Sequence, residues 1–333
     1  MSKEILVVGQ TPPPYHGQAV MVEKMLDGNY DDVELSHVRM AFSEDVDEVG
    51  KLGGGLALRK MIELVRVIVR IIRVGFIKQP DVLWYPPSGP DVVPVVRDLA
   101  ILLATRWLFP KTVFHFHAGG LSELYEELPA PLRPLFRAAF FRPDAAVRIS
   151  EQAPQDGRRL QAHREFVIPY GIEDACESYD DCATQHATAY DTDSTVDILF
   201  VGALRRSKGI MTLLRACKHL SAKRDAFTIR LMGRFESESF EREVNRYVER
   251  HGLERHVTFL GVLSGREKWD AFADADVFCF PSYYESETFG LVLVEAFCFG
   301  LPVVATRWSG IPTVVGEDGE CGFLVQPKDP DAV

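Results

Sequence analysis

Short, continuous apolar segments alternate with helical stretches through the whole chain, and this pattern constrains the fold most. In the first half these segments are rich in β-branched and aromatic residues and end at turn residues; they cover 4–9, 81–86, 112–118, 145–150 and 165–171. In the second half they cover 196–204, 227–233, 257–261, 276–281, 302–306 and 322–325, with helices expected near 208–221, 238–251, 265–273 and 290–299. Continuous apolar strands separated by helices form parallel sheets covered on both faces. Each half is therefore predicted to be a doubly wound α/β domain.

The length of 333 residues exceeds what one hydrophobic core usually serves, which also favours two domains. We place the first domain at 1–171 and the second at 196–333. Between them, 172–195 is polar, acidic and without apolar periodicity, as linkers and exposed excursions are. Ligands of open parallel sheets bind at the carboxyl ends of the strands, so the pattern predicts a ligand in a cleft between the domains.

Charge, cysteine pattern and hydropathy exclude several other classes. A net charge of -11 argues against a nucleic-acid binder that neutralises phosphates broadly. The cysteines form no C-x-x-C pair and no zinc pattern, so reduced thiols are expected. They are Cys176, Cys182, Cys217, Cys279, Cys298 and Cys321. The start MSKEILVVGQ lacks the regions of a signal peptide, and no apolar run reaches about 18 residues. A cytoplasmic protein is the expectation.

The loop after the first strand, in GQTPPPYHGQAVMVEKML at 9–26, has three prolines and Gly17 where a dinucleotide fingerprint would have G-x-G-x-x-G. An NAD-dependent enzyme is thus disfavoured, and no cofactor is expected. Gly17 would let the backbone approach an anionic ligand just before a helix N-terminus. An ordinary strand-to-helix turn is the alternative interpretation.

The second domain opens with a similar strand, loop and helix, in FVGALRRSKGIMTLL. Its loop places Arg205, Arg206 and Lys208 between a strand end and a helix N-terminus. A lysine there can hold a diphosphate through charge-assisted hydrogen bonds. Solvated surface charge is the alternative.

Two carboxylates frame a helix start in ESETFGLVLVE. Phe289, Gly290 and Leu291 are predicted to form the N-terminus, whose free N–H groups can take a phosphate. Glu287 precedes it in the loop, where it would face a hexose beyond the phosphates. Glu295 lies within the apolar helix and needs a partner, for which ribose hydroxyls are suitable. A helix N-terminal glutamate with a buried ion pair is the alternative.

The stretch ESETFGLVLVEAFCFGLPVVATRWSGIP resembles the E-x7-E region of glycosyltransferase family 4, the retaining, nucleotide-sugar-dependent enzymes of the GT-B fold. TPPPYHGQ, FHFHAGG, VIPYGIE, FVGALRRSKG and ECGFLVQPKD extend the similarity along most of the chain. The resemblance implies two Rossmann-like domains facing each other across a cleft and a hexose transferred from a nucleoside-diphosphate sugar to an acceptor hydroxyl. It also implies a glycan or lipid-linked acceptor and no metal.

The resemblance also assigns roles to residues. It implies that Glu287 contacts the donor sugar, Glu295 the ribose and Lys208 the leaving diphosphate, and that Gly17 approaches the diphosphate from the first domain. His117, in the loop FHFHAGG, matches a sugar-site histidine; a core or capping histidine is its alternative, as it is for His115.

One departure concerns the phosphate loop, where the family usually has an arginine directly after the glycine. Here that position is Ala203, and Arg205 or Arg206 could supply the charge from a shifted position. The D-x-D formed by Asp191 and Asp193 lies in the acidic linker rather than at a strand end, so we do not assign it a metal.

Residues 58–78 suggest contact with a membrane. Six basic residues against Glu63 give this segment a charge of +5, and four arginines share one helical face. A basic amphipathic helix can lie on an anionic membrane. A helix packed on the sheet with a solvated basic side is the alternative. The phenylalanines and arginines of 131–143 favour the membrane interpretation.

The chain ends at Val333, shortly after Asp329 and Pro330 would start a helix, so the second domain is expected to be truncated. The sequence therefore predicts a retaining hexosyltransferase of polysaccharide, glycolipid or lipid-linked glycan assembly, working in the cytoplasm or on the inner face of the membrane. A sugar-nucleotide epimerase of the same fold and a non-catalytic nucleotide-sugar-binding protein are the alternatives.

Overall fold

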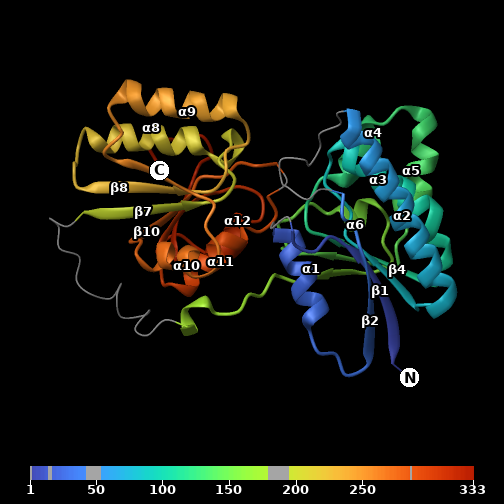
Figure 1. Ribbon diagram of the computed structural model, residues 1–333. Helices are drawn as coiled ribbons and strands as arrows, with labels where there is room; N and C mark the ends of the chain where they lie inside the picture. The colour runs from blue at the N-terminus through green and yellow to red at the C-terminus, as the bar shows by residue number, and fades with distance from the viewer. Residues whose placement is uncertain (1, 14–16, 43–53, 179–194, 286) are drawn as a thin grey trace. The chain divides into compact units, whose positions relative to one another are not determined.

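The structure is a computed structural model that describes residues 2–13, 17–42, 54–178, 195–285 and 287–333. Its contacts divide the chain into an N-terminal unit, Met1–Tyr170, and a C-terminal unit, Gly171–Val333 (Figure 1). Each unit has one parallel sheet and a hydrophobic core of its own. Both are Rossmann-like α/β domains, which confirms the predicted fold class.

The N-terminal unit contains a six-stranded parallel sheet in the order β2-β1-β3-β4-β5-β6. The strands are β1 Lys3–Gly9, β2 Val33–Arg39, β3 Val82–Tyr85, β4 Lys111–Phe116, β5 Ala145–Arg148 and β6 Glu165–Val167. Strand β2 was missing from the sequence-based assignment because it is an edge strand: VELSHVR carries polar and charged residues, and only Ser36 and Val38 are buried. Such a strand has no continuous apolar run.

Helices cover both faces of this sheet, and alternate strand residues show which face each helix covers. The helical segments are α1 Gly17–Asp27, α2 Gly54–Lys78, α3 Val92–Thr105, η2 Arg106–Leu108, α4 Leu121–Glu127, η3 Ala130–Leu132, α5 Arg133–Phe140 and α6 Asp156–Arg159. Leu6 of β1 belongs to the core under α2, α3 and α5, whereas Val7 packs with Val22 of α1 on the opposite face. This alternation follows from the two-residue period of a strand.

Helix α5 corrects one inference about the membrane. Its Phe136 and Phe140 are buried in the core, and Phe141, just beyond it, packs against the same core. The phenylalanines of 131–143 therefore give no support to a membrane surface. In this segment the spacing of the phenylalanines and arginines did not show whether the apolar face points into the core or toward solvent.

The C-terminal unit contains a six-stranded parallel sheet in the order β12-β11-β10-β7-β8-β9. Its strands are β7 Val196–Val201, β8 Phe227–Met232, β9 Val257–Gly261, β10 Val277–Phe280, β11 Val303–Thr306 and β12 Gly322–Val325. The helical segments are η4 Ala175–Ser178, η5 Arg206–Lys208, α8 Ile210–Ser221, α9 Glu238–His251, α10 Gly265–Ala273, α11 Leu291–Cys298 and α12 Ile311–Val315. All strands and helices expected in this half are present, while the short α12 was not predicted.

In the C-terminal unit, α8 and α9 lie on one side of the sheet and α10 and α11 on the other (Figure 1). The chain runs from β7 outward to β8 and β9, then returns to β10 on the other side of β7. The helices that follow β7 and β10, α8 and α11, therefore lie on opposite faces of the sheet. A doubly wound sheet binds its ligand at such a switch point, outside the carboxyl ends of the strands.

The cysteines differ from the expectation in one respect. Cys176 is disulfide-bonded, so the prediction of reduced cysteines is wrong for this residue. Among the described cysteines, Cys217, Cys279, Cys298 and Cys321 are free. The cysteine pattern therefore gives no argument about compartment. Most of the predicted linker, with Asp191 and Asp193, lies outside the described residues.

Candidate functional site

Two loops meet at the carboxyl edge of the C-terminal sheet, one after β7 and one after β10. Gly209 has φ 82°, and a Cβ there would lie 2.1 Å from the carbonyl oxygen of Pro281. The backbone N–H of Tyr283 donates to the carbonyl of Ser207 at 2.7 Å. Only glycine allows this approach, since a side chain would collide with backbone atoms. The two loops are thus held together along their length.

Lys208 and Glu287 meet across these loops. The lysine Nζ donates to Oε2 of Glu287, and both side chains are largely buried, with exposures of 16% and 12%. The Ser282 hydroxyl donates to the same oxygen at 3.2 Å. The structure therefore brings together two residues predicted for the site that are 79 positions apart in sequence.

Aromatic rings and a second cation surround this pair. Lys208 Nζ lies 5.2 Å from the ring centroid of Phe280 and 5.1 Å from that of Tyr284. The guanidinium of Arg205 lies 4.6 Å from the same Tyr284 ring, and its Nε is 3.5 Å from Glu236. Ring faces attract cations, so Tyr284 keeps Arg205 and Lys208 close despite their like charge.

Arg206 takes a different direction. It forms an exposed ion pair with Glu243 of α9 and packs over Phe240. The hydrogen bond to Glu243 is the main reason that the pKa of Arg206 is raised. Of the two arginines proposed to compensate for Ala203, the structure places Arg205 beside Lys208.

Helix α11 begins beside the loop that carries Glu287. Gly290 is its N-cap residue in the left-handed region, φ 78°, and Leu291 is the first helical residue. Phe289 is buried and anchors the turn. The first N–H groups of a helix have no intrahelical acceptor, so this terminus can bind an anion.

Glu295 lies in α11 and is paired with a lysine that the sequence did not indicate. Lys268 of α10 donates to Oε1 of Glu295 at 2.6 Å. The other oxygen, Oε2, is buried and has no hydrogen-bond partner within the described residues. The partner lies 27 residues upstream in a separate helix, so no local pattern could have identified it. Glu295 thus has one satisfied oxygen and one that can still accept.

In the N-terminal unit, His117 belongs to an aromatic cluster at the carboxyl end of β4. Its Nδ1 hydrogen-bonds the hydroxyl of Tyr170, and its ring stacks on His115 at 4.2 Å between centroids. Trp84 contacts both histidines edge-on. Burial lowers the pKa of His115 to about 4, so its ring is neutral at neutral pH. Tyr170 and Trp84 were not singled out from the sequence.

The loop after His117 is fixed by a buried carboxylate, Asp156. Its two oxygens accept from the N–H groups of Gly120 at 2.9 Å and Ser122 at 2.6 Å. Burial raises the pKa of Asp156, while these hydrogen bonds act in the opposite direction. Asp156 follows β5 in sequence, and no local sequence pattern indicates that it supports this loop.

Gly17, the remaining predicted site residue, is the first residue of α1 and is exposed. A Cβ at Gly17 would have no heavy atom within 4 Å. The structure therefore shows no steric need for glycine at this position within the N-terminal unit.

The C-terminal edge gathers groups that favour an anionic ligand. Lys208, Arg205 and the α11 terminus supply positive charge and N–H donors, while Glu287 supplies an acceptor for hydroxyl groups. Within the described ranges, no group of three or more His, Cys, Asp or Glu side chains is placed to hold a metal ion.

Part of the chain is similar to known glycosyl transferases. Residues 189–333 match the family model of glycosyl transferases group 1, which covers the site formed by Lys208, Glu287 and Glu295. The matched range lies almost entirely in the C-terminal unit.

Curated relatives extend the similarity into the N-terminal unit. The chain is 33% identical over 265 residues to the putative colanic acid biosynthesis glycosyltransferase WcaL of Salmonella typhimurium, covering 78% of this chain and 60% of that protein. It is 28% identical over 230 residues to the O-antigen chain mannosyltransferase C of Escherichia coli, covering 67% of this chain and 57% of that protein. The chain thus spans somewhat more than half the length of these two relatives.

Among solved structures, the chain is similar to HepE of Anabaena in complex with UDP and glucose. The TM-score is 0.62 at 19% sequence identity, over 100% of this chain and 88% of that chain. At this identity the similarity concerns the fold, which is that of GT-B glycosyltransferases.

Proposed function

We propose that this protein is a nucleotide-sugar-dependent glycosyltransferase that moves a hexose to an acceptor hydroxyl with retention of configuration, as glycosyltransferase family 4 enzymes do. The ion pair of Lys208 and Glu287 at the switch point of the C-terminal sheet is the observation that carries this proposal. A cation and an acceptor in contact provide the two partners that a sugar diphosphate needs: one for phosphate charge and one for sugar hydroxyls.

In the proposed mechanism, Lys208 exchanges Glu287 for the diphosphate when the donor binds. Negative charge develops on the departing diphosphate as the bond between the sugar and its phosphate oxygen breaks. Fixed hydrogen-bond donors around that oxygen stabilise the charge and lower the barrier. Lys208, Arg205 and the N–H groups at Phe289, Gly290 and Leu291 would be those donors. Glu287, released from the lysine, would accept hydrogen bonds from the sugar.

Glu295 would bind the nucleoside. Its Oε2 has no partner among the described residues, and a ribose hydroxyl would satisfy it while Lys268 keeps Oε1 occupied. We propose that Gly17 and His117 act on the same donor from the N-terminal unit, with the ring of His117 oriented by Tyr170. No resident metal is needed, since protein groups supply the positive charge.

The acceptor is proposed to be a glycan or a lipid-linked glycan of the cell envelope, reached from the cytoplasmic side. The names of the relatives WcaL and mannosyltransferase C refer to colanic acid and to the O-antigen chain. They support the proposal that the acceptor is an envelope polysaccharide. HepE, solved with UDP and glucose, supports a nucleotide-sugar donor.

The test combines donor binding with transfer. Thermal shifts with UDP-, GDP- and ADP-sugars would identify the base, because a ligand that binds the native state raises the melting temperature. Transfer is then measured on free and lipid-linked acceptors, with and without EDTA. We expect one donor to stabilise the protein and to be consumed in both conditions. Donor binding without transfer or hydrolysis to any acceptor would instead identify a nucleotide-sugar-binding protein.

A further inference from the structure

Helix α2 has two apolar faces, and only one packs on the sheet. Val67 and Ile71 are fully buried beneath it. On the opposite side, Leu58, Met61, Val65, Val69 and Phe76 are exposed by 56% to 65%. Their spacings of three, four, four and seven residues place them along a single outward stripe. A helix that only covers a sheet would carry polar residues there.

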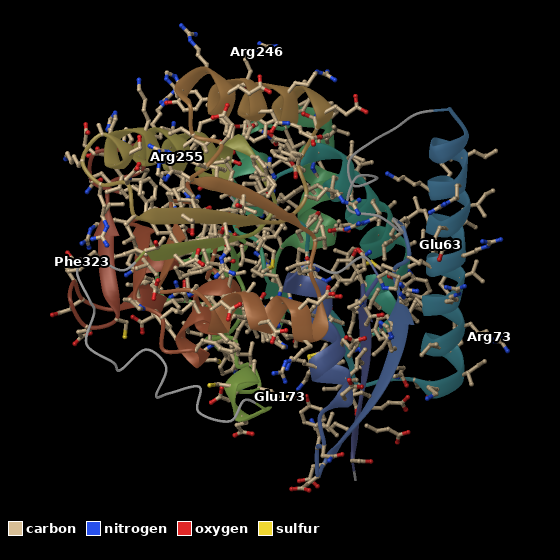
Figure 2. All side chains as sticks on the ribbon, turned by 60° about the vertical axis from the view of Figure 1, so that its left-hand side comes forward. Glu63, Arg73, Glu173, Arg246, Arg255 and Phe323 are labelled. Atoms are coloured by element: carbon tan, nitrogen blue, oxygen red, sulfur yellow. The ribbon has the colours of Figure 1, made fainter. Side chains whose placement is uncertain are left out.

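Arginines line one flank of this stripe. Arg59, Arg66, Arg70 and Arg73 are exposed, and Figure 2 shows Arg73 reaching outward from α2. The only acid of the helix, Glu63, has a side chain just 13% exposed and already contacts Arg66 at 3.6 Å and Arg70 at 3.4 Å. The outward side of α2 therefore combines aliphatic groups with positive charge.

The apolar surface continues onto the neighbouring helix. Helix α3 packs against α2, and its Val92 and Val96 are exposed by 61% and 57%. Its only charged residues, Arg97 and Asp98, pair with each other at 2.7 Å. At the far end, Trp107 of η2 is 70% exposed, and η2 adjoins α2, since a Cβ on Gly75 would lie 3.3 Å from Leu108.

We propose that the outward side of α2, α3 and Trp107 is a docking surface for an anionic lipid bilayer. The helices would lie in the interface plane, with the aliphatic stripe at the acyl boundary and the arginines at headgroup phosphates. Within the described ranges, no helix has the length and hydropathy to span a bilayer. Trp107 suits the same depth, because tryptophan is enriched at membrane interfaces.

Charge complementarity favours a bilayer over a second copy of the chain. A symmetric contact would place this surface against itself, and each copy would bring the same arginines while the one acid of α2, Glu63, is already engaged. Anionic headgroups supply the missing negative charge. The chain carries -11 overall, so a segment of +5 on this helix also orients the protein toward such a surface.

A membrane-docking surface would add to the acceptor side of the proposed function. It rests on that proposed function only for the identity of the acceptor. A surface that holds the protein on a membrane would bring lipid-linked acceptors to it. Donor binding at Lys208 does not depend on it, so the two proposals can fail separately.

Vesicle flotation tests the surface. The full chain is mixed with vesicles of phosphatidylcholine alone or with phosphatidylglycerol added, at low and at 150 mM salt. We expect flotation with anionic vesicles and little with neutral ones. The double variant Val65→Glu, Val69→Glu should lose at least about tenfold in partitioning, since two charges enter the apolar stripe. The control Val262→Glu, Phe323→Glu changes two equally exposed apolar residues of the C-terminal unit and should float normally; Figure 2 labels Phe323.

A second variant keeps the test decisive if Val65→Glu, Val69→Glu, the stripe variant, folds poorly. Arg66→Gln, Arg70→Gln, Arg73→Gln alters exposed side chains only, and partitioning should fall roughly fivefold per arginine. Failure of the wild-type chain to float with anionic vesicles would overturn the proposal. So would a dimer in light scattering that the stripe variant abolishes, which would assign the surface to a second copy. Lys208→Ala should float like wild type, so its loss of donor binding reports on the other proposal alone.

Discussion

The two units share a fold but differ in the chemistry at the carboxyl ends of their strands. The C-terminal edge holds charges in contact, Lys208 with Glu287 and Lys268 with Glu295. The N-terminal edge holds aromatic rings: His115 stacks on His117, Trp84 meets both edge-on, and Tyr170 stacks on His117. A charged edge suits phosphates, and an aromatic edge with hydrogen-bonding tips suits the neutral groups of a sugar. The difference between the two edges is consistent with the proposed roles of Lys208 and His117, one toward phosphate and one toward sugar.

The outer helices differ as clearly as the sheet edges. Helix α9 buries Phe240, Val244 and Val248 and fills its remaining positions mostly with charged residues. Its N-cap Ser237 accepts from the N–H of Phe240 at 3.2 Å. Helix α2 buries one side and leaves aliphatic residues on the other. Since α9 shows the ordinary pattern for a helix between a sheet and water, the difference supports the proposal that α2 is a docking surface.

Removing the positive charge of the C-terminal edge should have the largest effect. We expect Lys208→Ala to reduce the rate of transfer about 100- to 1,000-fold, because a fixed donor to the departing diphosphate is lost. The measurement is initial rates with the donor identified by thermal shift. Lys218→Ala, at an exposed lysine of α8 in the same unit, is the control and should leave the rate unchanged. Equal rates for the two variants would contradict the role of the charged edge.

A substitution at the close contact of the two C-terminal loops should have the next largest effect. Gly209→Ala places a methyl group 2.1 Å from the carbonyl oxygen of Pro281 at a positive φ, so we expect the free energy of unfolding to fall by about 3 kcal/mol or more. Gly252→Ala, at φ 63° with no atom within 4 Å, isolates the backbone strain and should cost about 1 kcal/mol. Calorimetric melting temperatures distinguish the two. A Gly209→Ala protein as stable as Gly252→Ala would show that the loops can separate.

The sequence predicted the elements that have strong local patterns. Helices α9 and α10 begin and end where expected, because their apolar period and end residues agree. Strand β2 was missed because an edge strand lacks a continuous apolar run, and α12 because five residues are too few for a period. The disulfide at Cys176 was missed because spacing alone does not show which thiols meet.

The residues of the candidate site also separate into those that the sequence could predict and those that it could not. Glu287, Lys208 and the α11 terminus could be predicted, since each lies at a strand-to-helix transition that is visible in the sequence. Lys268, Tyr170 and Asp156 could not, because each meets its partner across a long sequence separation from an element of its own. The exposure of the α2 stripe could not be predicted either. Periodicity shows that a helix is amphipathic, but not which of its apolar sides packs on the sheet.

The neutral state of His115 at the N-terminal edge can be tested through pH. The pKa of His115 is lowered by burial to about 4, so as pH falls through the ordinary value of 6.5 the unfolded chain binds a proton that the folded chain excludes. Stability is therefore lost progressively from pH 6.5 toward pH 4, by about 2 kcal/mol at pH 5. His115→Phe keeps a stacking ring without titration and should remove this part of the loss. Urea denaturation at pH 7 and pH 5 measures the difference, and identical pH dependence in both proteins would show that His115 is accessible to protons.

The smallest expected effect separates the two arginines that follow Ala203. Arg205→Ala should weaken donor binding about tenfold by calorimetry, because Arg205 lies on Tyr284 beside Lys208 and a hydrogen bond to a charged phosphate contributes about 1.5 to 3 kcal/mol. Arg206→Ala should change affinity less than about twofold, since its pair with Glu243 is exposed and contributes about 0 to 1 kcal/mol. The reverse order would mean that Arg206 leaves Glu243 when the donor binds. If neither variant changes affinity, the positive charge of the C-terminal edge rests on Lys208 and the α11 amides alone, and Lys208→Ala should then abolish donor binding.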